Sequence, residues 1–144
     1  MAITTNAICN SFKKELLQGE HNFSNPGGDT FKLAMFTSNA TLGKSTTGYA
    51  ASNEVSSPSG YSAGGKALVN AGTSLASNTA ITDFADLSFT GVTLTARGAL
   101  IYNTSESDKA VAVLDFGGDK TATSGTFTIQ FPAYTTSAAI LRIA

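Results

Sequence analysis

The chain has 144 residues, a length typical of one domain, and its 9 Lys and Arg against 10 Asp and Glu give a net charge of -1. This balance offers no basic surface, so neither nucleic acid nor an anionic membrane is expected as a partner. Charged residues make up only 13% of the chain, which predicts a neutral surface suited to packing within an assembly.

The N-terminal region carries neither a signal-peptide pattern nor the roughly 20 consecutive apolar residues that a membrane span needs. We therefore expect a protein made without an export signal. Three Asn-x-Ser/Thr matches then carry little weight, because glycosylation requires secretion. They are Asn22, Asn39 and Asn103.

Apolar residues with a helical spacing of four mark the start of the chain. They are Ile8, Phe12 and Leu16. The pattern predicts one amphipathic helix over residues 4–19, which Gly19 would end in a left-handed conformation. The candidate N-terminal caps are Thr4, Thr5 and Asn6. Cys9 borders the apolar stripe, and we interpret it as a small buried side chain rather than a nucleophile.

Beyond the turn signal at residues 25–28 the apolar period changes to two, which predicts a strand at 31–36. Residues 38–60, rich in Ser, Thr, Gly and Asn and with Pro58 near the end, predict a long ordered loop. A short edge strand is possible within it, around Glu54 and Val55.

The second half of the chain predicts strand after strand, with turn chemistry between them. Apolar parity flips at Gly91, which predicts a β-bulge. The expected strands cover residues 87–96, 99–102, 111–116, 127–131 and 140–143, with a polar hairpin loop at 104–109 and a glycine turn at 117–119. The fold class is therefore mainly β: an antiparallel β-sandwich or jelly roll of about seven to eight strands with one short N-terminal helix. We expect a single domain over residues 1–144, with the sandwich at 30–144.

Three short motifs resemble catalytic signatures but lack their context. The nucleophile-elbow pattern at residues 60–64 would make Ser62 a nucleophile, yet the single histidine, His21, precedes it in the chain. The phosphate-loop spacing at 60–66 is followed by Ala67 where Ser or Thr should bind magnesium, so Lys66 is expected to be a solvated strand residue. The kinase-like triplet at 115–117, which begins with Asp115, lacks every partner motif.

Metal ligands are also too few. One Cys and one His cannot form a zinc site. Asp83 and Asp86 could share calcium with Asp29 or Asp119, but capping a turn at 82–85 is the preferred interpretation. His21 is expected only to favour the dipole of the helix end. We assign no catalytic, cofactor-binding or metal-binding residue, expect no cofactor, and predict that the protein is not an enzyme.

Carbohydrate binding remains open, because β-sandwiches commonly support it. The chain has no Trp, and its tyrosines are Tyr49, Tyr61, Tyr102 and Tyr134. Tyr49 and Tyr61 are the better candidates for a sugar platform. The preferred interpretation is that each tyrosine buries a ring edge and keeps its hydroxyl wet.

Several blocks of sequence together resemble a family of small structural proteins of tailed bacteriophages. They are TFKLAMFT (30–37), NEV (53–55) leading to GYSAGGKAL (60–68), LTARGALIYN (94–103) and residues 110–118. The resemblance covers most of the chain from residue 30 onward and implies a virion protein. The most similar role within the family is a capsid decoration, or cement, protein.

This resemblance implies that the chain binds the assembled lattice of the major capsid protein on the outside of the virion, after synthesis in the host cytoplasm. Such a protein usually self-associates symmetrically, and a trimer is the expected homo-oligomer. The contacts would come from the N-terminal helix or from the 38–60 loop, and the sequence does not choose between them. The alternative is a tail or receptor-binding module that recognises a host surface glycan.

Overall fold

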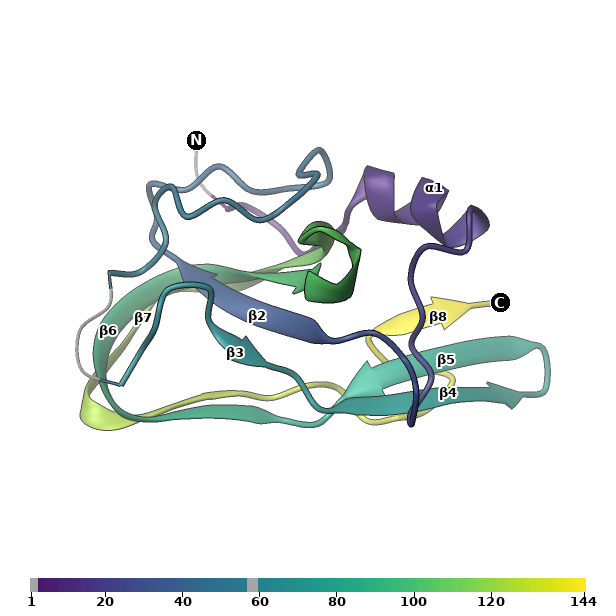
Figure 1. Cartoon of the computed structure of the whole chain (residues 1–144). Helices are drawn as coiled ribbons and strands as arrows, with labels where there is room; N and C mark the ends of the chain where they lie inside the picture. The colour runs from purple at the N-terminus through teal and green to yellow at the C-terminus, as the bar shows by residue number, and fades with distance from the viewer. Residues whose placement is uncertain (1–2, 57–59) are drawn as a thin grey trace.

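The computed structural model describes residues 3–56 and 60–144, so Pro58 lies outside the described residues. Within these described residues, one short helix and eight strands make up the fold (Figure 1). Their bounds are β1 (Ala7–Ile8), α1 (Asn10–Leu17), β2 (Phe31–Phe36), β3 (Lys66–Ala67), β4 (Asn70–Ala76), β5 (Thr79–Phe84), β6 (Leu87–Asn103), β7 (Lys109–Ile129) and β8 (Leu141–Ile143). A 3-10 turn, Thr104–Glu106, lies in the predicted hairpin loop between β6 and β7.

The strands form two antiparallel sheets. The larger has the order β1-β7-β6-β2-β3, and the smaller has the order β4-β5-β8. This arrangement confirms the mainly β class and is consistent with a β-sandwich.

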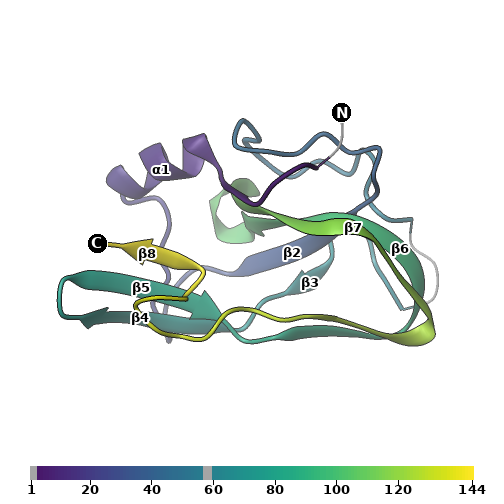
Figure 2. The same ribbon diagram turned by 180° about the vertical axis from the view of Figure 1, so that it is seen from behind.

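A long hairpin, β6 with β7, shapes the molecule by curling back on itself (Figures 1 and 2). The pairing register shifts between Ala96 and Gly98, where the hairpin bends. A Cβ added at Gly98 would lie 2.4 Å from the carbonyl oxygen of Leu114, so only glycine allows this close approach. Gly91 has φ +63 at a second register shift, which confirms the predicted bulge.

Strand β2 lies in the centre of the core and is covered on both faces. Phe31, Leu33 and Met35 are buried, as their alternation predicts, and Phe36 on the opposite face is also buried. The ring of Tyr49, from the loop after β2, lies 6.5 Å from that of Phe36. The loop therefore covers the face that a simple two-layer arrangement would leave exposed.

The predicted helix begins too early in the sequence. Residues 7–8 extend along the edge of β7, and the amide of Cys9 donates to the carbonyl of Val111 at 3.0 Å. The helix starts only at Asn10, with Cys9 at the N-cap and no side-chain cap. Strand pairing thus overrides the helical period at Ile8, whereas Gly19, with φ +74, follows the helix end as predicted.

Strand boundaries in the second half also differ from the predicted ones. The expected turn at 82–85 falls mostly within β5, because its residues pair with β4 and β8. The glycine turn at 117–119 does not end a strand, since β7 continues through a register shift there. The predicted strands at 87–96 and 99–102 are parts of the single strand β6.

The 38–60 loop is irregular in its described part, as predicted. It contributes an isolated bridge between Glu54 and Phe36 in place of the proposed edge strand. The weakly patterned residues that form β4 and most of β5 were not predicted as strands. Their Ser, Thr, Asn and Gly content resembles a loop, and the pairing of β5 with β4 and with β8 from the distant C-terminus supplies what local pattern lacks.

Candidate functional site

Of the residues considered for catalysis, Ser62 is exposed, whereas His21, Lys66 and Asp115 have structural partners. His21 is buried, its Nε2 lies 2.9 Å from Glu15 Oε1, and its Nδ1 accepts from the Asn103 amide at 3.0 Å. Nε2 therefore carries the proton that is donated to Glu15. With both ring nitrogens engaged, His21 does more than face a helix dipole, and neither nitrogen is directed at Ser62.

Lys66 and Asp115 also hold parts of the fold together. Lys66 is an exposed residue of β3, as predicted, and its Nζ donates to the carbonyl of Ser88 at 2.7 Å. Asp115 pairs with Arg97 at 3.2 Å and accepts from the Gly117 amide at 2.9 Å. Lys66 therefore links β3 to β6, and Asp115 links β7 to β6 and closes a turn.

Three of the four aspartates considered for calcium accept hydrogen bonds from different partners, and the fourth, Asp119, is an exposed residue of β7. Asp83 is 1% exposed, and its Oδ1 accepts from the Phe84 amide at 2.9 Å. Its Oδ2 has no partner among the described residues, and burial raises the pKa of this carboxyl. Asp86 accepts from the Phe131 amide, whereas Asp29 accepts from Asn103. Across residues 3–56 and 60–144, no three acidic, His or Cys side chains group as metal ligands do.

Cys9 is fully buried and has no disulfide partner. Burial is the main cause that raises the pKa of its thiol to about 11, with a further contribution from Glu15. The thiol is therefore protonated at neutral pH, as expected for a packing residue.

A carboxylate, Glu54, binds the loop after β2 to the body of the molecule. Its Oε1 accepts from the Tyr49 hydroxyl at 2.6 Å, and its Oε2 accepts from the Tyr61 hydroxyl and the Gly64 amide, each at 2.7 Å. Tyr61 is 3% exposed, and the Tyr49 ring stacks on that of Tyr102 at 4.6 Å. Burial, followed by the hydrogen bond to Glu54, raises the pKa of both Tyr49 and Tyr61.

This network was not anticipated from the sequence. It occupies the two tyrosines proposed as a sugar platform, since both hydroxyls are bonded internally. The sequence signal was an isolated Glu54 in a long uncharged stretch, flanked by Tyr49 and Tyr61 at distances of five and seven residues. A lone acid among tyrosines is a plausible hydrogen-bond hub only when the loop is known to fold back on the sheet.

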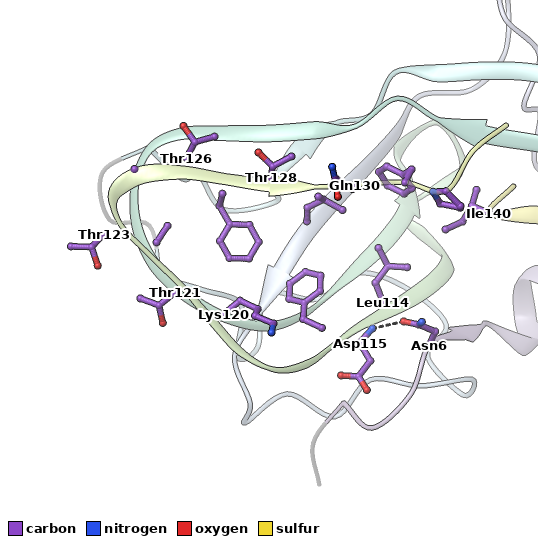
Figure 3. A pocket seen from close by; sticks show the side chains of 17 residues that line it. Asn6, Leu114, Asp115, Lys120, Thr121, Thr123, Thr126, Thr128, Gln130 and Ile140 are labelled. Carbon is purple, nitrogen blue, oxygen red and sulfur yellow. Dashed lines mark hydrogen bonds between the residues drawn. The ribbon is translucent and has the colours of Figure 1, made fainter. Parts of the chain in front are cut away.

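A groove opens where the two arms of the curled strand β7 separate (Figure 3). Its volume is about 800 Å³. The floor is apolar and comprises Leu114, Phe116, Phe127, Ile129, Phe131 and Ile140. Leu114, Phe116, Phe131 and Ile140 are only partly buried. Polar side chains border the groove, with Thr126, Thr128 and Gln130 along one arm in Figure 3.

The outer edge of β7 is covered at one end only. Loop residue Gly48 bridges to Lys109, β1 pairs with Ala112 and Val113, and Asn6 Oδ1 accepts from the Asp115 amide at 2.6 Å. Past Asp115, no strand of the described chain pairs with this edge. The bare part of the edge borders the groove, so unpaired backbone groups and apolar side chains lie together.

Large aliphatic side chains are exposed elsewhere on the surface. Leu17, at the end of α1, is 92% exposed, and Leu75, in β4, is 73% exposed. Val69 and Ile143 are also exposed, and both belong to the region of the smaller sheet. In Figures 1 and 2 the β4–β5 hairpin projects at the end of the molecule opposite the bend of β6 and β7.

Among the described residues, no helix has the length and apolar character required to cross a membrane. In comparisons with known proteins, no family model, curated protein or solved structure matches the chain. Exposed aliphatic side chains and unpaired strand edges on the described surface offer apolar burial and backbone hydrogen bonding. Both are interactions of protein association.

Proposed function

We propose that the chain is a structural protein of a tailed-phage virion, a decoration protein that binds the assembled major capsid protein lattice from outside. It acts without catalysis or cofactor and as a homo-oligomer, with a trimer as the expected form. The observation that carries this proposal is the exposure of large aliphatic side chains on a chain that is only 13% charged. The resemblance of residues 30–118 to phage structural proteins supplies the virion context.

Binding to a completed lattice stabilises it, because a ligand that binds the assembled state shifts the equilibrium towards that state. Stable interfaces bury on the order of 1,200–2,000 Å² in total. Each exposed Leu or Ile that becomes buried contributes roughly 1.5–3 kcal/mol. Leu17, Leu75 and Ile143 are thus suitable anchors for contacts with other subunits.

Of the two segments considered for the capsid contact, we propose the helix. Leu17 lies at the free end of α1 and is nearly fully exposed. The loop after β2, by contrast, directs Tyr49 and Glu54 towards the body of the molecule. The Leu17 side chain of the helix is therefore available to a partner, whereas the Tyr49 ring of the loop already packs against the rest of the molecule.

The glycan-binding alternative receives less support from the described surface. Tyr61 is buried, and Tyr49 is bonded to Glu54 and stacked on Tyr102. Tyr134 is the most exposed tyrosine, at 40%, and its hydroxyl donates to the carbonyl of Gly72 at 3.2 Å. A flat, open aromatic platform is therefore not formed by these side chains.

Cosedimentation with capsids tests the proposal. Purified chain is added to capsids from a phage in which its gene is deleted, and we expect it to sediment with them and to raise the temperature of capsid disruption. Leu17→Lys should abolish cosedimentation, whereas Asn39→Lys, on the exposed part of the loop, should not. Wild-type chain that stays in the supernatant would refute the proposal, and the opposite pattern of variants would assign the contact to the loop.

A further inference from the structure

Two incomplete strand edges lie on different sheets, one on β7 and one on β4. We propose that the β4 edge of one copy adds to the bare edge of β7 in a second copy, beside residues 121–129, and inserts Leu75 into the groove. The occupant of the groove is thus another copy of this chain. This inference specifies the surfaces of the self-association that the proposed function includes.

The acceptor edge already binds an extended segment of the same protein. The N-terminal residues run antiparallel to β7, with Ala7 opposite Val113 and Ile8 opposite Ala112. The Asn6 side chain satisfies one further amide, that of Asp115. A second strand placed beyond Asp115 would continue this ladder along the same edge, where backbone groups have no strand partner within the described chain.

The groove supplies a reason for an apolar anchor. Leu114, Phe116 and Phe131 border it and remain partly exposed to solvent. A leucine side chain seated among them would cover apolar surface on both partners. The hydrogen-bonding edge and the apolar groove together match strand addition, in which backbone bonds give affinity and a side-chain pocket gives selectivity.

The donor strand has the required chemistry. Strand β4 is the terminal strand of its sheet, and Leu75 near its end is 73% exposed. The start of β4 is contacted by Asn25, whose amide donates to the carbonyl of Asn70 at 2.6 Å. Residues 73–76 are exposed. No charged residue occurs from Ala67 to Thr82, so this strand brings no charge to the Thr-rich arm of the groove.

Donor and acceptor are different surfaces, so the contact is head to tail rather than self-complementary. A contact of this type leaves each copy with one free donor and one free acceptor until a ring closes. This property permits a complementation test. A copy with a defective donor and a copy with a defective acceptor retain one functional surface each, and these two surfaces fit one another.

The test measures molar mass in solution by light scattering after gel filtration, with no capsids present. We expect the wild-type chain and the control Leu17→Lys to be oligomeric. Leu75→Lys and Thr126→Lys, each at an exposed position, should be monomers near 14.7 kDa. Their 1:1 mixture should form dimers of twice that mass, and circular dichroism should show that each variant is folded.

A monomeric wild type would overturn the inference, as would a mixture in which both variants remain monomers, or a variant that stays oligomeric. The result is independent of the capsid assay. A monomer that binds capsids would refute the proposed self-association and leave lattice binding intact. An oligomer that shows the predicted complementation but does not bind capsids would support self-association and refute lattice binding.

Discussion

The segment after β2 is irregular but is hydrogen-bonded to the body of the molecule, whereas the β4–β5 hairpin is regular but exposed at its end. The segment, described over residues 38–56 and 60–65, has almost no regular structure, yet Glu54 accepts three hydrogen bonds and the Val55 amide donates to the carbonyl of Met35 at 2.9 Å. We call it the anchored segment. The hairpin is regular, but the end of β4 is exposed.

In this comparison, charge-assisted hydrogen bonds to a part-buried carboxylate attach an irregular segment to the body of the molecule, whereas strand pairing leaves the end of a regular hairpin exposed. The anchored segment contributes to stability, since it covers the face of β2 that bears Phe36. The hairpin end contributes little, which leaves it available to a partner. Four predictions test this difference.

Alkaline pH should affect the anchored segment most strongly. Burial raises the pKa of Tyr102 to about 12 and raises the pKa of Tyr49 and Tyr61 as well, against about 10 for unfolded tyrosine. The stability that these groups contribute is complete below pH 10 and is lost as pH rises from 10 through 12, because the unfolded chain ionises first.

We therefore expect tyrosinate absorbance and loss of the circular dichroism signal to appear together above pH 10. The measurement uses the Tyr134→Phe variant, so that only the three buried or half-buried tyrosines report. The same variant unfolded in urea supplies the reference titration. Tyrosines that ionise near pH 10 while the fold persists would contradict the network.

Removal of the hub carboxylate should destabilise the protein by several kcal/mol. Glu54→Ala leaves the Tyr49 hydroxyl, the Tyr61 hydroxyl and the Gly64 amide without their acceptor. At about 1–3 kcal/mol for each buried donor, a loss of roughly 3 kcal/mol or more is expected from urea unfolding. Glu54→Gln keeps one acceptor oxygen and should lie between wild type and Glu54→Ala. A loss below about 1 kcal/mol would show that the hub is dispensable.

A single hydroxyl deletion should have an intermediate effect. Tyr61→Phe removes the donor to Glu54 and also the acceptor of the buried Met35 amide, at 2.9 Å. We expect a loss of about 1–2 kcal/mol in the free energy of unfolding. Tyr134→Phe, at a partly exposed site, is the matched control and should change stability by about 0.5 kcal/mol or less. Equal effects for the two variants would remove the distinction between the regions.

The smallest effect is expected at the end of the hairpin. Leu75→Ala should change stability by less than about 0.5 kcal/mol, because the side chain is 73% exposed. Ile81→Ala, on the buried side of the same hairpin, should cost roughly 2–4 kcal/mol. Thermal unfolding distinguishes the two when both substitutions are made in the Thr126→Lys variant, which is expected to be monomeric and keeps Leu75 exposed. A large loss for Leu75→Ala would mean that the hairpin end supports the fold itself.

Much of the β framework follows from local pattern. Residues 31–36 and the bulge at Gly91 were predictable, because period-two apolar spacing and a parity flip are local signals. The helix start was not, since Ala7 and Ile8 pair with residues more than 100 positions away. Strand β4 lacks a strong alternation and is defined by its pairing with β5.

The candidate surfaces depend on long-range contacts even more than the strand framework does. The groove requires the two arms of β7 to separate, which the predicted turn at 117–119 did not suggest. The Glu54 network requires the loop to fold back over β2. Leu17 directly follows Leu16 of the apolar stripe of the helix, and only the position of α1 relative to the sheet shows that Leu17 faces solvent.

Cryo-electron microscopy of virions from the phage that encodes this chain tests the central claim most directly. The account predicts density that fits the two-sheet domain on the outer surface of the capsid, in contact with major capsid subunits, with the Leu17 end of α1 towards the lattice. Density at the tail alone, or virions that lack the chain, would contradict it.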